Sequence, residues 1–125
     1  MAPRYTDKVA QYFWRPVRPG GTQLRGLAGS MQCGTLIAFT ADTSAGRLHN
    51  LGFRAFACPH IIAACNWCAD CLEGGPVEAL AHIPLDDLRE ELDIPVEKAG
   101  KLLILQDALL ACYADYQARS AASGS

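Results

Sequence analysis

Two cysteines of this chain, Cys33 and Cys58, stand where folding could bring two thiolates together. Cys33 comes just before a segment rich in strand-forming residues, and Cys58 follows a second such segment. If the segments pair as an antiparallel hairpin, the outer ends of the two strands lie side by side. Two thiolates at adjacent strand ends would make half of a four-ligand metal site. The simpler alternative, two structural thiols, stays open on spacing alone.

The residues after Cys58 indicate that it begins a helix. Pro59 suits the first helical turn, and Gly74-Gly75-Pro76 ends the helical pattern. Unpaired N–H groups and the helix dipole at such an end favour a thiolate, the form of cysteine that binds metal. His60 could add a further ligand, although a polar side chain of the first turn is the simpler interpretation.

Cys65 lies seven residues beyond Cys58, on roughly the same helix face and about 10 Å along the axis. That distance is too long for one mononuclear site, but both thiols could face one cleft, so the predicted metal ligands are Cys33, Cys58 and Cys65. The pair Cys65 and Cys68 has the spacing of a redox motif, yet it falls inside the helix instead of at its N-terminus, which argues against redox catalysis. A small buried apolar role is the default for Cys112, and it stays one of two open alternatives for Cys68 and Cys71.

Size and composition exclude several classes of protein. The 125 residues suffice for one domain with its own core, and half of them are hydrophobic. A net charge of -2 without a basic cluster argues against nucleic acid as a partner. The apolar stretch 56–65 is far too short for a membrane span. Six cysteines without an apolar signal core at the N-terminus predict a cytoplasmic protein with reduced thiols.

Hydrophobic periodicity predicts an α+β fold, a small antiparallel sheet packed on one face by helices. We expect a single domain over 1–119 and a disordered tail over 120–125. The segment from Pro19 to Gly34 is glycine-rich and is predicted as loop with room for one short edge strand. The predicted strands are 35–40 and 47–56, joined by a turn over 41–46. The predicted helices are 6–14, 59–73, 76–81, 84–92 and 97–118.

The order of these features is similar to that of a known family. The segment from Tyr5 to Pro16, reading Tyr-Thr-Asp-Lys-Val-Ala-Gln-Tyr-Phe-Trp-Arg-Pro, resembles the opening helix of the IscU/NifU N-terminal-domain scaffolds. Cys33-Gly34 resembles their first Cys-Gly-Asp motif, and Phe53 to Ala63 resembles their Phe-x-x-x-Gly-Cys-x-x-x-Ile-Ala. Asp107 to Tyr116 resembles their closing helix. The resemblance runs from Tyr5 to Gln117 and implies an IscU-like fold.

The family assembles iron–sulfur clusters on three cysteines, with an aspartate after the first and often a histidine before the third. Its first two cysteines match Cys33 and Cys58, whereas the aspartate falls at Thr35 and the His-Cys pair falls at Gly100-Lys101. The third thiolate is therefore missing. A cysteine desulfurase supplies sulfur in this family, and a chaperone that passes clusters to apo-protein acceptors binds a segment that is only partly kept here, at Ile94 to Lys98.

The resemblance implies a non-enzymatic scaffold or carrier that holds a [2Fe–2S] cluster, or alternatively zinc, through Cys33 and Cys58. Two protomers could share one cluster, with two thiolates from each, so a homodimer is one expectation. Alternatively, the chain is a cluster-less paralogue that binds a desulfurase or a chaperone and regulates assembly. Lys101 could pair with a Cys58 thiolate and keep it reactive without metal. Sulfur acceptance by a reactive thiol ranks last, because the insertion usual in such relatives is missing.

Overall fold

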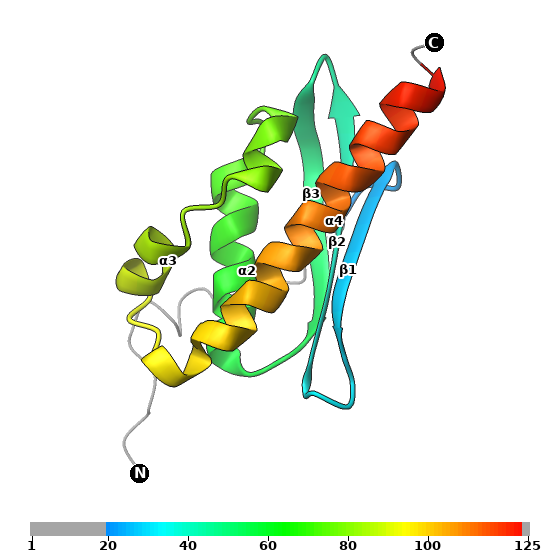
Figure 1. Cartoon of the computed structure of the whole chain (residues 1–125). Helices are drawn as coiled ribbons and strands as arrows, with labels where there is room; N and C mark the ends of the chain where they lie inside the picture. The colour runs from blue at the N-terminus through cyan, green and yellow to red at the C-terminus, as the bar shows by residue number, and fades with distance from the viewer. Residues whose placement is uncertain (1–19, 124–125) are drawn as a thin grey trace.

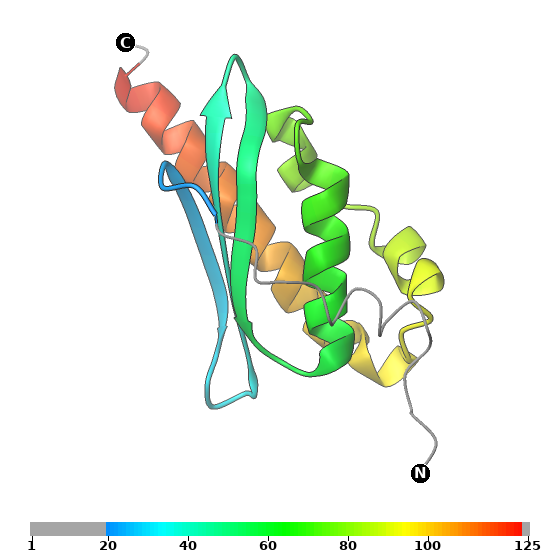
Figure 2. The same ribbon diagram turned by 180° about the vertical axis from the view of Figure 1, so that it is seen from behind.

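The computed structural model describes residues 20–123, and the helix predicted over 6–14 lies outside them. A three-stranded antiparallel sheet in the order β1-β2-β3 is packed on one face by α2 and α4 (Figures 1 and 2). This confirms the predicted α+β class. No helix of the described residues is long and apolar enough to span a membrane. The elements are β1 Leu24–Ser30, β2 Thr35–Ser44, β3 Arg47–Phe56, α2 Pro59–Leu72, η1 Val77–Ala81, α3 Leu85–Glu91, η2 Val96–Lys98 and α4 Ala99–Ser123.

The β2–β3 hairpin is longer than the sequence predicts. Its turn consists of Ala45 and Gly46 alone, at φ 55° and 75°, the left-handed pair of a two-residue hairpin turn whose twist matches that of the strands. β2 therefore continues to Ser44, and the predicted turn over 41–46 is wrong in its first four residues. Strand β3 has the predicted bounds. The expected edge strand exists as β1.

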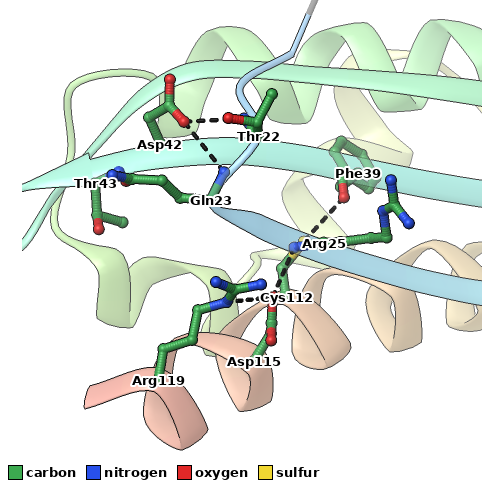
Figure 3. Close-up of polar contacts among 9 residues, drawn as sticks. All are labelled: Thr22, Gln23, Arg25, Phe39, Asp42, Thr43, Cys112, Asp115 and Arg119. Carbon is green, nitrogen blue, oxygen red and sulfur yellow. Dashed lines mark hydrogen bonds and ion pairs between the residues drawn. The ribbon is translucent and has the colours of Figure 1, made fainter. Parts of the chain in front are cut away.

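Asp42 explains why the polar end of β2 is ordered. Its carboxylate accepts hydrogen bonds from the backbone N–H groups of Thr22 at 2.9 Å and Gln23 at 3.2 Å (Figure 3). It also accepts one from the side chain of Asn50 at 3.0 Å. The Asn50 bond, followed by that of Thr22, lowers the pKa of Asp42. Asp42 thus fastens the chain before β1 to the hairpin at the end of the sheet remote from Cys33.

The long helix α4 crosses the sheet over β1 and β2, and a glycine allows it to come close. A Cβ added at Gly26 would lie 2.2 Å from the carbonyl oxygen of Ala108 and 2.4 Å from the backbone nitrogen of Cys112. The Cys112 thiol donates to the carbonyl of Phe39 at 3.2 Å (Figure 3). α4 runs to Ser123, so it extends into the predicted disordered tail. Alanine is the best helix former, and three alanines after residue 117 support this extension.

Candidate metal centre

Cys33 lies in the four-residue turn that joins β1 to β2, and its side chain is exposed. Its backbone N–H donates to Ser30 Oγ at 3.2 Å, and its thiol, when protonated, donates to the carbonyls of Ser30 at 3.2 Å and Thr35 at 3.3 Å. Hydrogen bonding by the Ser30 side chain, followed by the backbone of Thr35, lowers the pKa of the Cys33 thiol. This turn therefore favours the form of cysteine that binds metal.

Cys58 is the N-cap of α2, as predicted, and is partly buried. Its backbone is extended, and its carbonyl accepts from the N–H groups of Ile61 and Ile62, each at 3.0 Å. Its thiol makes no capping hydrogen bond to the helix. The sulfur thus lies at the positive N-terminal end of a 14-residue helix, and it does not cap the helix.

The strand register places the two thiols at one end of the sheet. Thr35 pairs with Ser30 on β1, and the next residue, Leu36, pairs with Phe56 on β3. Cys33 precedes this pairing by two residues and Cys58 follows it by two. We call this end of the molecule, with the turn 31–34 and the start of α2, the hairpin end. The α4 N-terminus lies at the same end (Figure 1).

The charge of Lys98, directly before α4, acts on His60 in the first turn of α2. His60 is only 7% exposed, and burial, followed by the charge of Lys98, lowers its pKa. Lys98 ends η2, directly before α4, so the first turns of the two helices are close. Lys101, which stands where the family has its third cysteine, is the third residue of α4 and is partly buried. The missing ligand position thus belongs to the element next to Cys58.

Thr35, at the position of the family's aspartate, carries a polar atom that the fold does not satisfy. Its side chain is fully buried, and within the described part of the chain Oγ1 has no hydrogen-bond partner. A buried polar group without a hydrogen-bond partner lowers the free energy of unfolding by about 1–3 kcal/mol. It lies on the first residue of β2, two residues after Cys33, and on the same sheet face as the buried Ile37, which packs against the helices. A ligand held at the hairpin end could use this hydroxyl.

The structure separates Cys65 from the predicted ligand pair. Cys65 is fully buried in the core, and burial raises the pKa of its thiol. Cys68 is buried too, and burial also raises the pKa there. Periodicity places Cys58 and Cys65 near one face of the helix. It does not show that this face is buried in the core at Cys65, after the first turn. Residues 20–123 contain no group of three or more His, Cys, Asp or Glu side chains that could hold a metal ion.

Known proteins resemble this chain along most of its length. The NifU-like N terminal domain family matches residues 4–123. The iron–sulfur cluster assembly scaffold protein IscU of Haemophilus influenzae is 24% identical, over 92% of this chain and 97% of that protein. The mitochondrial iron sulfur cluster assembly protein 1 of Kluyveromyces lactis is 26% identical, over 92% of this chain and 68% of that protein. The bifunctional protein NifU/MnmA of Rubrobacter xylanophilus is 32% identical over 95% of this chain, which spans 26% of that protein.

A solved structure shows the same fold. The putative iron–sulfur cluster assembly scaffold protein of the SUF system from Fervidobacterium islandicum superposes with a TM-score of 0.67 at 10% identity, covering 87% of this chain and 96% of that one. At this identity the likeness concerns the fold alone. Because the family match spans nearly the whole sequence, the chain belongs to the NifU-like N terminal domain family, in which proteins named as iron–sulfur cluster assembly scaffolds are found.

Proposed function

We propose that this protein is a scaffold or carrier for iron–sulfur clusters, which it holds as cargo through the thiolates of Cys33 and Cys58. The observation that carries the proposal is the position of both thiols at the hairpin end, where Cys33 is exposed and Cys58 is only partly buried and makes no capping hydrogen bond. Family membership supports the cargo class, because relatives are named for cluster assembly. Cys65 is left out of the ligand set, since a thiolate there would have to form inside the core.

The donor set fits a [2Fe–2S] cluster better than a closed zinc site. A structural zinc site takes four protein ligands, usually thiolates and imidazoles, and the described residues bring no three such groups together. A [2Fe–2S] cluster carries its own sulfide bridges, so two thiolates satisfy one iron. A sulfide could also accept a hydrogen bond from the Thr35 hydroxyl, which has no partner among the described residues, if the bound cluster reaches this buried position. Zinc remains the second cargo to test.

Each residue then has a separate task. The Ser30 side chain helps to keep Cys33 in its charged form. The N-terminus of α2 supplies a positive field beside Cys58, and Lys101 adds a cation in the first turn of α4. These groups offset the negative charge of a cluster bound by thiolates. The chain itself performs no bond-making chemistry in this proposal, and a cysteine desulfurase would supply the sulfur.

The test is reconstitution of the full chain with ferrous iron and sulfide under anaerobic conditions. We expect iron and acid-labile sulfide in equal amounts and a visible charge-transfer band, both lost in Cys33→Ala and in Cys58→Ala. Cys71→Ala is the matched control, because Cys71 is an exposed cysteine of the same helix as Cys58, close to its other end. Retention of cluster by both Cys33→Ala and Cys58→Ala would refute the assignment.

A second candidate function is favoured by one observation. With Lys101 in place of the family's third cysteine and no three-ligand group among residues 20–123, the chain could act as a binding module for a desulfurase or a chaperone without cargo. This candidate predicts that the double variant Cys33→Ala/Cys58→Ala binds a desulfurase as tightly as the unchanged chain. Calorimetric titration of both proteins would decide, since the cargo proposal expects weaker binding when the acceptor thiols are removed.

A further inference from the structure

The sheet face opposite α2 and α4, which we call the outer face, bears exposed apolar side chains. In β2, Leu36 and Ala38 alternate with residues buried against the helices, so they point to the outer face. Direct partners in an antiparallel pair share a face, and therefore Phe56, opposite Leu36, and Leu27, opposite Ala38, lie on it too. Phe56 is 52% exposed and Leu27 60% exposed. We call these four residues the outer-face patch.

The described part of the chain begins on the same face. Asp42 and Thr40 point to the outer face by the same alternation. A Cβ added at Gly21 would meet the carboxylate of Asp42, and one added at Gly20 would meet Oγ1 of Thr40. The N–H of Gly21 also donates to the carbonyl of Asn50 on β3 at 2.7 Å. Figure 2, in which the outer face is turned to the viewer, shows this start of the chain in front of the sheet.

These two glycines also give the chain a direction. Towards the N-terminus, the backbone passes from Asp42 at Gly21 to Thr40 at Gly20. The next outward residues of β2 in that direction are Ala38 and Leu36, which belong to the outer-face patch. The residues before Gly20 therefore set out along the outer face towards the patch and the hairpin end.

The sequence before Gly20 has an apolar stripe of the kind that would cover such a patch. Four of the ten aromatic residues of the chain lie there. If 6–14 and the residue before it are helical, as the sequence predicts, four large apolar side chains recur at spacings of three and four and share one side of the helix. This stripe consists of Tyr5, Val9, Tyr12 and Phe13. Gln11 lies on the opposite, polar side.

We infer that the predicted helix over 6–14 docks on the outer-face patch of its own chain through this stripe. The connection is long enough, since residues 14 to 20 span up to about 20 Å when extended, and Thr40 to Leu36 is about 14 Å along β2. The helix itself is about 13 Å long and so matches the length of the patch. Phe56 is two residues from Cys58, so a partner that uses this side of the hairpin end has to displace the helix. The inference needs no cargo and is independent of the proposed function.

The experiment measures hydrogen exchange of the backbone amides of residues 7–14 by mass spectrometry, in the full chain without cargo. We expect exchange at least about tenfold slower than in a synthetic peptide of residues 1–19, because so short a helix is marginal until it docks. Val9→Ser and Phe56→Ser should each remove most of this protection. Gln11→Ser is the matched control for Val9→Ser, because it places the same residue on the polar side. Leu103→Ser is the matched control for Phe56→Ser, because Leu103 is 54% exposed on α4, across the sheet; both controls should keep the protection.

Three results would overturn the inference. The first is exchange of residues 7–14 at the rate of the free peptide. The second is protection that survives both Phe56→Ser and Leu27→Ser, because the helix would then lie on another surface; the two variants are on separate strands, so one suffices if circular dichroism shows that the other does not fold. The third is protection that disappears when the protein is diluted about a hundredfold, which would place the segment of another copy on the patch. Docking within one chain predicts the same protection at both concentrations.

Discussion

The hairpin end and the core treat the same side chain in opposite ways. At the hairpin end, Cys33 is exposed, and hydrogen bonding by Ser30 lowers the pKa of its thiol. In the core, Cys65 and Cys112 are fully buried, and burial raises the pKa of Cys112 to about 12. The first environment favours a metal-binding thiolate, and the second favours a neutral thiol that packs like an apolar residue. Position in the fold, and not cysteine content, determines which thiols can do chemistry.

Alkylation rates give the largest expected difference between the two environments. We expect iodoacetamide to modify Cys33 and Cys58 at least about 10³-fold faster than Cys65, Cys68 and Cys112, because the buried thiols react only after the fold opens. Mass spectrometry of timed samples measures this. Since the pKa of Cys33 is lowered from 9.0, its rate should reach its plateau at a lower pH than in the denatured chain. Alkylation of Cys65 as fast as Cys33 in the folded protein would contradict the comparison.

Gly26→Ala should disturb the packing of α4 on β1 and leave the hairpin end unchanged. The added methyl group would meet the backbone of α4 at Ala108 and Cys112, and backbone cannot move as a side-chain end does. We expect a loss of about 3 kcal/mol in the free energy of unfolding, measured by urea denaturation. Gly100→Ala is the control, because nothing lies within 4 Å of its added Cβ; it should be neutral or stabilise by up to about 1 kcal/mol. Equal effects of the two would show that α4 does not pack closely on β1.

Serine substitutions compare one thiol from each environment directly. Cys65→Ser places a hydroxyl in the core and should destabilise the fold by about 2 kcal/mol, whereas Cys33→Ser should change the free energy of unfolding by less than about 0.5 kcal/mol. The two variants should rank the opposite way in cluster loading. Cys33→Ser should bind no cluster, and the folded fraction of Cys65→Ser should bind as much cluster as the unchanged chain. Urea denaturation and iron analysis of the same samples provide both readings. Loss of loading in Cys65→Ser at full stability would restore Cys65 as a ligand.

The sequence predicts the hairpin end better than it predicts what surrounds it. The strand before Cys58 and the N-terminus of the helix after it are local features, since alternation and Pro59 mark them, and the structure has both where expected. The side of α2 that enters the core is a tertiary property, so the shared helix face of Cys58 and Cys65 was not enough to place Cys65. The prediction ended β2 too early because residues 41–44 are of turn-forming types. The carboxylate of Asp42 accepts hydrogen bonds from the backbone of residues 22 and 23, and this contact between residues distant in sequence is not visible in the local pattern.

Thr35→Val gives the smallest expected effect, and its sign distinguishes a functional residue from a structural one. Removing a buried hydroxyl that has no partner among the described residues should leave the free energy of unfolding unchanged or raise it by about 1 kcal/mol. If the hydroxyl donates to a bound cluster, the same variant should release its cluster faster, although the fold is no less stable. Thermal unfolding of the cargo-free protein and the decay of the cluster absorbance measure the two effects. If Thr35 were needed only for folding, the variant would lower both the thermal stability and the lifetime of the cluster. If Thr35 touches no cargo, the rate of cluster decay would stay unchanged.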